Sequence, residues 1–368
     1  MAESLTFEPD YVSPPGETLE DVLDERGMTQ AELAERTGLS RKTVNEIVQG
    51  KAPITPDTAL GLERVLGVAA RFWNAREHHY REARARREET ESLAQHADWV
   101  NRFPYREMAE MGLVSWVDGR SRDSIPRRGR ELLDFFGVAS PEQWKNVWLQ
   151  PSVAFRKALT FTSDPEPVSA WLRDGEKIAL EKLETAPFDE TRFKTALHEV
   201  RRLTRETPEV FCERMVRCCA EAGVAVVFTP QLPKGRISGA TQWVRPDLAL
   251  IQLSLRYRTD DHFWFTFFHE AAHIVLHGKR DVFLEGSDDT GEHEKEEEAN
   301  QWAASFLIPP GKLNSFVGRE DRSRSAIVSF ADELGIAPGI VVGQLQHRNF
   351  IPYSRHNDLK RKLKWKER

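Results

Sequence analysis

The feature that most constrains this chain is an H-E-x-x-H pattern, in which His269, Glu270 and His273 stand among apolar residues. On a helix, residues four apart lie about 40° apart around the axis and about 6 Å along it, so both imidazoles can hold one metal ion. Glu270 lies beside that face, where its carboxylate can take a proton from a metal-bound water. Charged side chains are rarely buried without a partner, which argues against an ordinary core helix. We therefore expect a metal site on a helix over 261–277, with Glu270 as the catalytic base.

A second helical pattern, over 292–307, offers carboxylates for a third ligand. A catalytic zinc ion usually takes three protein ligands and leaves one position open. When the apolar stripe of this helix is projected back one turn, Glu296 lies about 50° from its centre, Glu298 about 110° and Glu297 about 150°. Glu296 is therefore the expected third ligand. Asn300 lies on the same side and is expected to hydrogen-bond a ligating histidine without touching the metal itself.

His277 is an alternative third ligand, eight residues past His269. On a straight helix it lies about 12 Å along the axis and about 80° around it, too far to share one ion with His269. The longer metzincin pattern H-E-x-x-H-x-x-G-x-x-H is also absent. Zinc suits the chemistry because it lowers the pKa of a bound water from about 15.7 to about 7. We therefore expect zinc as the cofactor, held by the two histidines of the pattern and by Glu296.

The composition of the chain indicates a soluble protein. Its 368 residues carry a net charge of −6, which argues against a protein coated in nucleic acid but allows a local basic face. The N-terminus is acidic and lacks the apolar core of a secretory signal. The longest apolar run, 263–276, contains charged residues and is too short to span a membrane. Three clustered cysteines are a poor disulfide framework and indicate a reducing compartment. We expect a cytoplasmic protein that does not contact a membrane.

Residues 29–47 have the spacing of a helix-turn-helix. Thr29 and Ser40 can each cap a helix, and Gly38 suits the left-handed turn between the two helices. The second helix begins with donor-rich side chains of the kind that contact bases or phosphates. A role in protein contacts is the alternative, because acidic residues flank the basic ones. The residues expected to contact DNA are Thr29, Gln30, Ser40, Arg41, Lys42, Asn45 and Lys51.

The remaining segments are helical or β-rich. Residues 91–205 follow a helical pattern with turn signals, and their tryptophans, Trp116 among them, indicate core positions. A β-rich passage follows, with a strand at 224–228 and a hairpin formed by 237–244 and 248–255. Residues 331–345 repeat the spacing of the helix-turn-helix. We interpret this repeat as a structural helical module; the alternative is a second nucleic-acid or repressor contact, aided by the basic C-terminal tail.

Two parts of the chain resemble known families. The segment HEAAHIVLH, followed by EEEANQWAASFLIPP, resembles the ImmA/IrrE family of metallo-endopeptidases over about residues 206–350. This resemblance implies a zincin-like fold with a small twisted sheet, an active-site helix and a glutamate helix. It also implies that the two histidines and Glu296 are metal ligands, that Glu270 is the general base, and that a bacterial transcriptional repressor is the usual kind of substrate. Residues 17–75 resemble XRE-type domains of phage repressors and HigA-like antitoxins.

These patterns predict an α+β chain in four parts. The expected parts are a helix-turn-helix domain over 1–90, a helical intermediate region over 91–205, a zincin-like metallopeptidase domain over 206–316 and a helical C-terminal module over 317–368. The expected function is that of a regulatory zinc-dependent endopeptidase with a DNA-binding domain, which cleaves a helix-turn-helix repressor or partner. The alternative is a non-enzymatic DNA-binding regulator, or a HigA-like antitoxin, whose zinc site is structural or sensory.

The expected partners follow from this function. We expect DNA to bind the N-terminal domain and a helix-turn-helix protein to be the substrate, and a homodimer stays open. An extended substrate segment is expected alongside the edge of strand 237–244 or 248–255, so that backbone hydrogen bonds position the scissile carbonyl.

Overall fold

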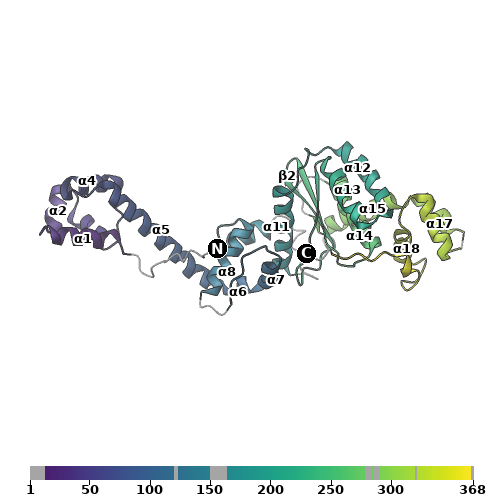
Figure 1. Cartoon of the computed structure of the whole chain (residues 1–368), viewed down its shortest axis with the longest axis horizontal. Coiled ribbons are helices and arrows are strands. Elements are labelled where there is room, and N and C mark those ends of the chain that lie inside the picture. Colours follow the sequence, from purple (N-terminus) through teal and green to yellow (C-terminus); the bar gives the residue numbers. More distant parts are fainter. Residues whose placement is uncertain are drawn as a thin grey trace. The chain divides into compact units, whose positions relative to one another are not determined.

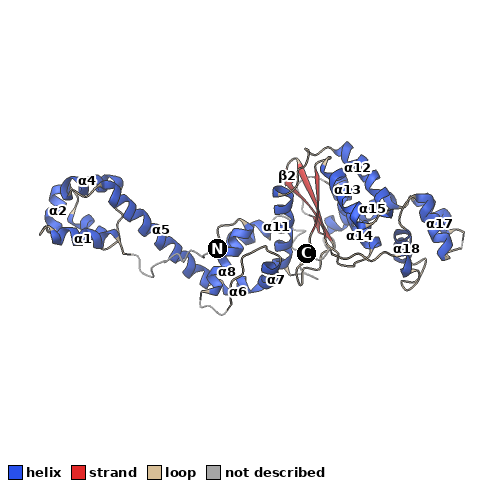
Figure 2. Ribbon diagram, viewed as in Figure 1, coloured by secondary structure: helices blue, strands red, loops and turns tan. Residues whose placement is uncertain are grey.

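The computed structural model describes residues 13–119, 123–149, 164–277, 283–284, 290–319 and 321–365. Helices dominate, and the strands in the described part of the chain lie in one sheet (Figures 1 and 2). The chain divides into two compact units, residues 1–97 with 122–127 and residues 98–121 with 128–368. The α+β class expected from the sequence is therefore confirmed.

The first unit consists of helices whose boundaries the sequence marks. The amide of Glu32 donates to the Thr29 hydroxyl, and the Glu32 carboxylate accepts from the Thr29 amide, which completes a capping box. Gly38 ends that helix with a φ of 75°, and Ser40 caps the next by accepting from the amide of Thr43. These features confirm the predicted helix-turn-helix. The helices of this unit are α1 (Pro15–Glu25), α2 (Gln30–Thr37), α3 (Arg41–Val48), α4 (Pro56–Leu66) and α5 (Ala70–Ala94).

The core of the first unit lies beneath the turn between α2 and α3. Leu33, Val44 and Ile47 are buried in one cluster with Trp73 of α5, so the opposite face of α3 is left to solvent. Further along α5, residues 77–91 contain arginine–glutamate pairs four positions apart. Opposite charges at this spacing lie on neighbouring turns and favour a helix, which explains why this charged run is helical although it buries little apolar surface.

Helices α6 to α9 surround an aromatic cluster of the second unit. The rings of Phe103 and Trp144 meet edge to face with centroids 5.3 Å apart, and Trp99 and Phe136 also contact Trp144. Trp116, which the sequence placed in the core, is 60% exposed, so that prediction was wrong. It lies in the loop between α7 and α8, where Val114 and Val117 are buried instead. These helices are α6 (Ala97–Arg102), α7 (Tyr105–Glu110), α8 (Ser124–Phe136) and α9 (Pro141–Trp148).

The sheet has the strand order β1-β3-β2-β4. β1 runs parallel to β3, whereas β2 runs antiparallel to both β3 and β4. β2 and β3 form the predicted hairpin, with residues 246–247 at its turn. Alternate residues of β1 face opposite ways: Val224 and Val226 join one core cluster, and Ala225 and Val227 join another. The strands are β1 (Val224–Phe228), β2 (Gly239–Arg245), β3 (Leu248–Leu253) and β4 (Phe283–Leu284).

Helices cover both faces of the sheet. α11 packs against the face that carries Ala225 and Val227, and α12, α13 and α14 cover the other face (Figure 1). The larger core also contains buried side chains of α15 to α18, so it crosses the predicted boundaries at 205/206 and 316/317. The four-part division of the chain stays a prediction. The remaining elements are α11 (Pro165–Glu181), α12 (Glu190–Arg202), η1 (Leu203–Arg205), α13 (Pro208–Ala220), α14 (Asp260–Leu276), α15 (Thr290–Leu307), α16 (Pro310–Val317), α17 (Arg324–Leu334), α18 (Pro338–His347) and η2 (Asn357–Leu359).

Helix length and apolarity were the basis for expecting no membrane span. Within the described residues, no single helix is both long and apolar enough to cross a membrane. α17 and α18 reach that length and apolarity only together, and they are bent by 113° at the break between them. Their apolar residues, such as Ile327 and Val341, lie in the larger core.

Candidate metal centre

α14 carries the H-E-x-x-H pattern through the core of the second unit. Its first turn contains two acidic residues, which favour a helix N-terminus, and nearly all residues from Phe263 to Ile274 are buried. His269 and His273 are each 1% exposed. α15 packs along α14 and contributes Glu296, which is 8% exposed. The two helices therefore bring three polar side chains into a nearly dry environment.

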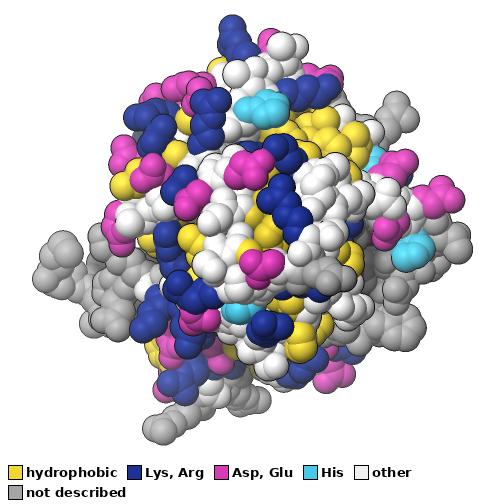
Figure 3. Space-filling model, turned by 90° about the vertical axis from the view of Figure 1, so that its right-hand side faces the viewer, with side chains coloured by type: hydrophobic (Ala, Val, Ile, Leu, Met, Phe, Trp, Pro, Cys, Tyr) yellow, Lys and Arg dark blue, Asp and Glu magenta, His cyan; other side chains and the backbone are white. Residues whose placement is uncertain are grey.

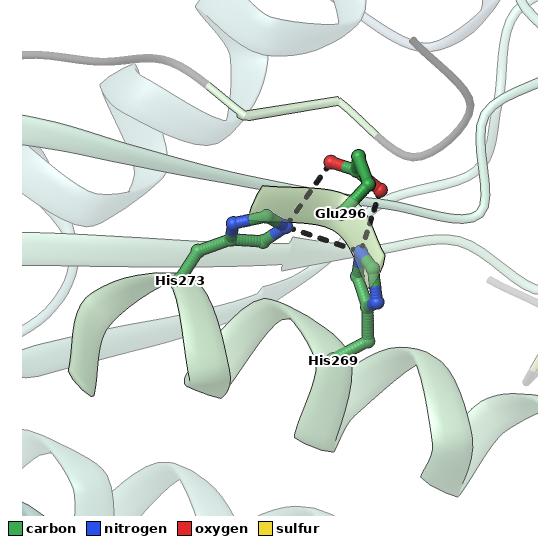
Figure 4. Close-up of side chains that lie close together, drawn as sticks. All are labelled: His269, His273 and Glu296. Atoms are coloured by element: carbon green, nitrogen blue, oxygen red, sulfur yellow. Dashed lines mark hydrogen bonds and ion pairs between the residues drawn. The ribbon is translucent and has the colours of Figure 1, made fainter. Parts of the chain in front are cut away.

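These three side chains converge (Figure 4). The Nε2 atoms of His269 and His273 lie 3.1 Å apart. Glu296 places Oε2 3.2 Å from His269 Nε2 and Oε1 3.3 Å from His273 Nε2. One ligand atom from each residue lies within 4.8 Å of the other two. The structure thus brings together the three residues predicted as metal ligands, while Glu297 and Glu298 of the same helix are exposed.

The protonation states of the cluster suit a metal ion. Burial opposes ionisation of Glu296, but the hydrogen bonds and charges of the two histidines outweigh it and lower the pKa of Glu296 to about 2. Burial lowers the pKa of His273 to about 4, against the opposing effect of Glu296. At neutral pH, His273 is therefore neutral and Glu296 ionised, the forms that ligate metals. Two imidazoles and one carboxylate form a donor set found in catalytic zinc sites, so these residues fit zinc.

Glu270, the predicted base, is fully buried on the same helix. The hydroxyl Oγ1 of Thr241, on β2, lies 2.8 Å from Glu270 Oε2 and 2.9 Å from the Glu270 carbonyl oxygen, and it is the donor in both contacts. Gly239 permits this approach, because a Cβ there would lie 2.8 Å from Glu270 Oε1 and 2.6 Å from Thr266 Cγ2. Our sequence reasoning missed Thr241 and Gly239. The one available signal was a glycine inside a predicted strand, which often marks a close backbone approach.

The sequence also suggested roles at the metal site for two other side chains, His277 and Asn300. Neither belongs to the converging group of three ligands. Among the described residues, the group of ligand atoms that lie within 4.8 Å of one another does not include an atom of His277. The Nδ1 atom of His277 instead lies 2.9 Å from His273 Nδ1. Its Nε2 lies 3.2 Å from Glu298 Oε2. Asn300 is half-buried and, within the part of the chain that the structure describes, makes no hydrogen bond to either ligating histidine. The role expected for Asn300 therefore stays a prediction.

The residues predicted to contact DNA fall into three groups. The hydroxyls of Thr29 and Ser40 serve as helix caps. Arg41, Lys42 and Asn45 are exposed on α3, on the face opposite its buried apolar residues. These three side chains are therefore accessible to a partner. The two remaining candidates are Gln30, which is half-buried, and Lys51, which is exposed.

Comparison with known proteins finds a family match for two segments of the chain. Residues 19–73 match the helix-turn-helix family, and residues 219–342 match the family of IrrE N-terminal-like domains. The uncharacterized HTH-type transcriptional regulator YddM of Escherichia coli (strain K12) is 30% identical over 59 residues, which are 16% of this chain and 63% of that protein. A crystal structure of a candidate antidote protein of a plasmid maintenance system from Nostoc punctiforme is 31% identical and covers 23% of this chain and 91% of that chain, with a TM-score of 0.22. A TM-score of this size carries no argument about the fold.

The chain therefore carries a helix-turn-helix domain and a metallopeptidase-like domain. That second domain belongs to the family of IrrE N-terminal-like domains, a peptidase family, and the first is a helix-turn-helix domain of the XRE type. Both resemblances noted in the sequence are confirmed.

Proposed function

We propose that this protein is a zinc-dependent endopeptidase joined to a DNA-binding domain, and that it acts in regulation by cleaving a helix-turn-helix repressor or partner. The observation that carries the proposal is the convergence of His269, His273 and Glu296, with contacts of 3.1–3.3 Å, beside the buried Glu270. Structural zinc sites are usually closed by four protein ligands, whereas three are typical of catalytic sites. The described residues contribute three.

Each residue of the site has a distinct part in the proposed reaction. The two histidines and Glu296 would hold zinc, which when bound polarises a carbonyl group and makes water more acidic. Glu270 accepts a proton from the attacking water and delivers it to the leaving amide nitrogen. Thr241 holds the Glu270 carboxylate through its 2.8 Å hydrogen bond, so the base does not have to be oriented during the reaction.

The sheet limits where a peptide substrate can bind. β3 lies between β1 and β2 and is hydrogen-bonded on both edges, so our expectation of substrate beside 248–255 was wrong. Among the described residues, β2 pairs with β4 only at Ala240 and Thr241. We propose that an extended substrate segment binds along the rest of β2, residues 242–245, where among the described residues only β3 pairs with the strand.

DNA binding is proposed through the exposed face of α3. Arg41 and Lys42 supply positive charge for phosphates, and Asn45 supplies an amide that can read a base edge. Joining this domain to the peptidase would raise the effective concentration of a partner docked on it, to about the millimolar range. This supports a substrate that binds the same operator DNA as the first domain, or that docks on that domain. A helix-turn-helix repressor is such a substrate.

The variant Glu270→Gln tests the proposal. Wild type and variant, each loaded with zinc, are incubated with co-purified or co-encoded helix-turn-helix proteins, and the products are identified by mass spectrometry. We expect the variant to keep its zinc and to cleave at least about 100-fold more slowly, as for loss of a general base. Glu297→Gln, at an exposed position on α15, is the matched control and should cleave like wild type.

Two results would contradict the proposal in different ways. Equal cleavage by wild type and Glu270→Gln would remove this residue from the mechanism. Zinc-loaded wild type that binds DNA but cleaves neither itself nor any helix-turn-helix protein would favour a regulator with a structural or sensory zinc site.

A further inference from the structure

The imidazole at the end of α14, His277, contacts the candidate metal centre from outside. α14 ends at Leu276, and His277 has an extended backbone with φ −113° and ψ 158°. Its amide donates to the His273 carbonyl oxygen, a helix-ending bond that any residue could make. The second contact, in contrast, depends on the imidazole ring. The His277 side chain is 4% exposed, and its ring centroid lies 5.0 Å from that of the His273 ring.

The two rings meet through like atoms, Nδ1 to Nδ1 at 2.9 Å, so one nitrogen must donate and the other accept. A neutral imidazole carries one proton. If the Nε2 lone pair of His273 binds a metal ion, the His273 proton is on Nδ1, and this atom becomes the donor. His277 Nδ1 must then accept, which places the His277 proton on Nε2, 3.2 Å from the carboxylate oxygen Oε2 of Glu298.

We infer that His277 is a positioning residue for the metal ligand His273, and that Glu298 holds His277 in the tautomer that this role requires. The inference rests on the proposed function only in that His273 Nε2 binds a metal ion. It assigns a role to the two side chains that helical geometry excluded as ligands. It also gives α15 two contributions to the site, because Glu296 faces the ligand cluster and Glu298, two residues later, faces His277.

The two contacts differ in strength. His277 is buried against His273, and loss of the partner that orients a ligating histidine typically costs 10- to 100-fold in metal affinity. The Glu298 side chain is 67% exposed, and exposed charge contacts contribute about 0–1 kcal/mol, or at most about fivefold. Substitution of His277 should therefore weaken metal binding more than substitution of Glu298.

The experiment measures zinc affinity of the full chain by competition with a chromogenic chelator. His277→Leu removes the acceptor, whereas His277→Asn keeps an acceptor oxygen at the position of Nδ1. We expect about 10- to 100-fold weaker binding for His277→Leu and near-wild-type binding for His277→Asn. Glu298→Ala should weaken binding by up to about fivefold, and Glu297→Ala, its exposed neighbour, should have no effect.

A second measurement reads the protons directly. In the zinc-loaded protein labelled with ¹⁵N-histidine, NMR should show the His273 proton on Nδ1 and the His277 proton on Nε2. A proton on His277 Nδ1 would overturn the inference, as would wild-type affinity in His277→Leu or equal losses in His277→Leu and His277→Asn. Wild type that binds no zinc would overturn both the inference and the proposed function, whereas zinc binding without cleavage would overturn the proposed function alone.

Discussion

The start of α14 contains an acid whose charge we expect to reduce stability. Asp260 is 2% exposed, and its Oδ1 accepts a hydrogen bond of 3.0 Å from the amide of Arg361, in the C-terminal segment. The next residue, Asp261, is also buried and pairs with Lys360 at 2.6 Å. Burial, and then the charge of Asp261, raises the pKa of Asp260 from 3.8 to about 6.

The sign of the effect follows from linkage. The pKa of Asp260 is higher in the folded chain than in the unfolded one, so the protonated carboxyl group favours the folded state. This contribution to the free energy of unfolding is fully present below pH 3.8 and is lost as pH rises through about 6. The difference of about two pH units corresponds to about 3 kcal/mol. Asp260→Asn keeps an acceptor for the Arg361 amide and removes the charge. The variant should therefore be more stable than wild type at pH 7, by up to about 3 kcal/mol, with a gain that shrinks toward pH 4.

The measurement is urea unfolding of the metal-free full chain between pH 4 and pH 7. Hydrogen–deuterium exchange in α14 follows this unit separately from the helix-turn-helix unit, which has its own transition. Glu209→Gln, at an exposed position in the first turn of α13, controls for the loss of a negative charge at a helix N-terminus. A difference between Asp260→Asn and wild type that does not change with pH would refute the reasoning, and lower stability of the variant at pH 7 would reverse its sign.

Three further predictions concern the metal site and DNA. Glu296→Ala should lower the zinc content, measured by elemental analysis, more than Glu298→Ala does; the reverse order would refute the helical-phase argument. Thr241→Val removes a hydrogen bond to the buried Glu270 and leaves that acceptor without this donor, so it should lower the free energy of unfolding by about 1–3 kcal/mol. It should also slow cleavage at unchanged zinc content, and a wild-type rate would show that Thr241 does not hold Glu270. Arg41→Ala and Lys42→Ala should each weaken DNA binding of the full chain and lower the slope of log K against log salt by about one. Anisotropy titrations measure that slope, and binding that does not depend on salt would contradict phosphate contacts.

Local sequence patterns predicted the features that depend on one or two helices. The inward position of Glu296 followed from the apolar stripe of α15, in which Ala299 and Ala303 are fully buried. The caps at Thr29 and Ser40 followed from residue type and spacing alone. In each case the deciding contacts lie within four residues, so a single sequence contains enough information.

Contacts between distant segments could not be predicted in this way. Thr241 and Glu270 are 29 positions apart, and Asp260 and Arg361 are 101 apart. Nothing in either local pattern specifies these pairs, which exist because the sheet and the C-terminal segment pack on α14. The contact of His277 with His273 was missed for another reason. The straight-helix argument assumed that α14 continues, whereas the helix ends at Leu276 and brings the ring back beside its last turn.

The repeated spacing at 331–345 shows how similar patterns can support different roles. α17 ends at Gly335 with a φ of 68°, as α2 ends at Gly38, so the turn is reproduced. The helix that follows differs, because α18 buries Ile340 and Val341 in the larger core, whereas α3 leaves its polar residues exposed. α18 also approaches α14 closely, since a Cβ at Gly339 would lie 2.5 Å from Asp260 Oδ1.

A buried helix cannot enter a DNA groove. Among the described side chains in the view of Figure 3, basic and acidic groups are intermixed and do not form one continuous basic patch. Nucleic-acid binding depends on clustered positive charge that neutralises phosphates. The structure therefore favours our interpretation of 331–345 as a structural module that packs against α14. The same helix–turn–helix geometry serves packing where its second helix is apolar, and is open to a partner where that helix is polar.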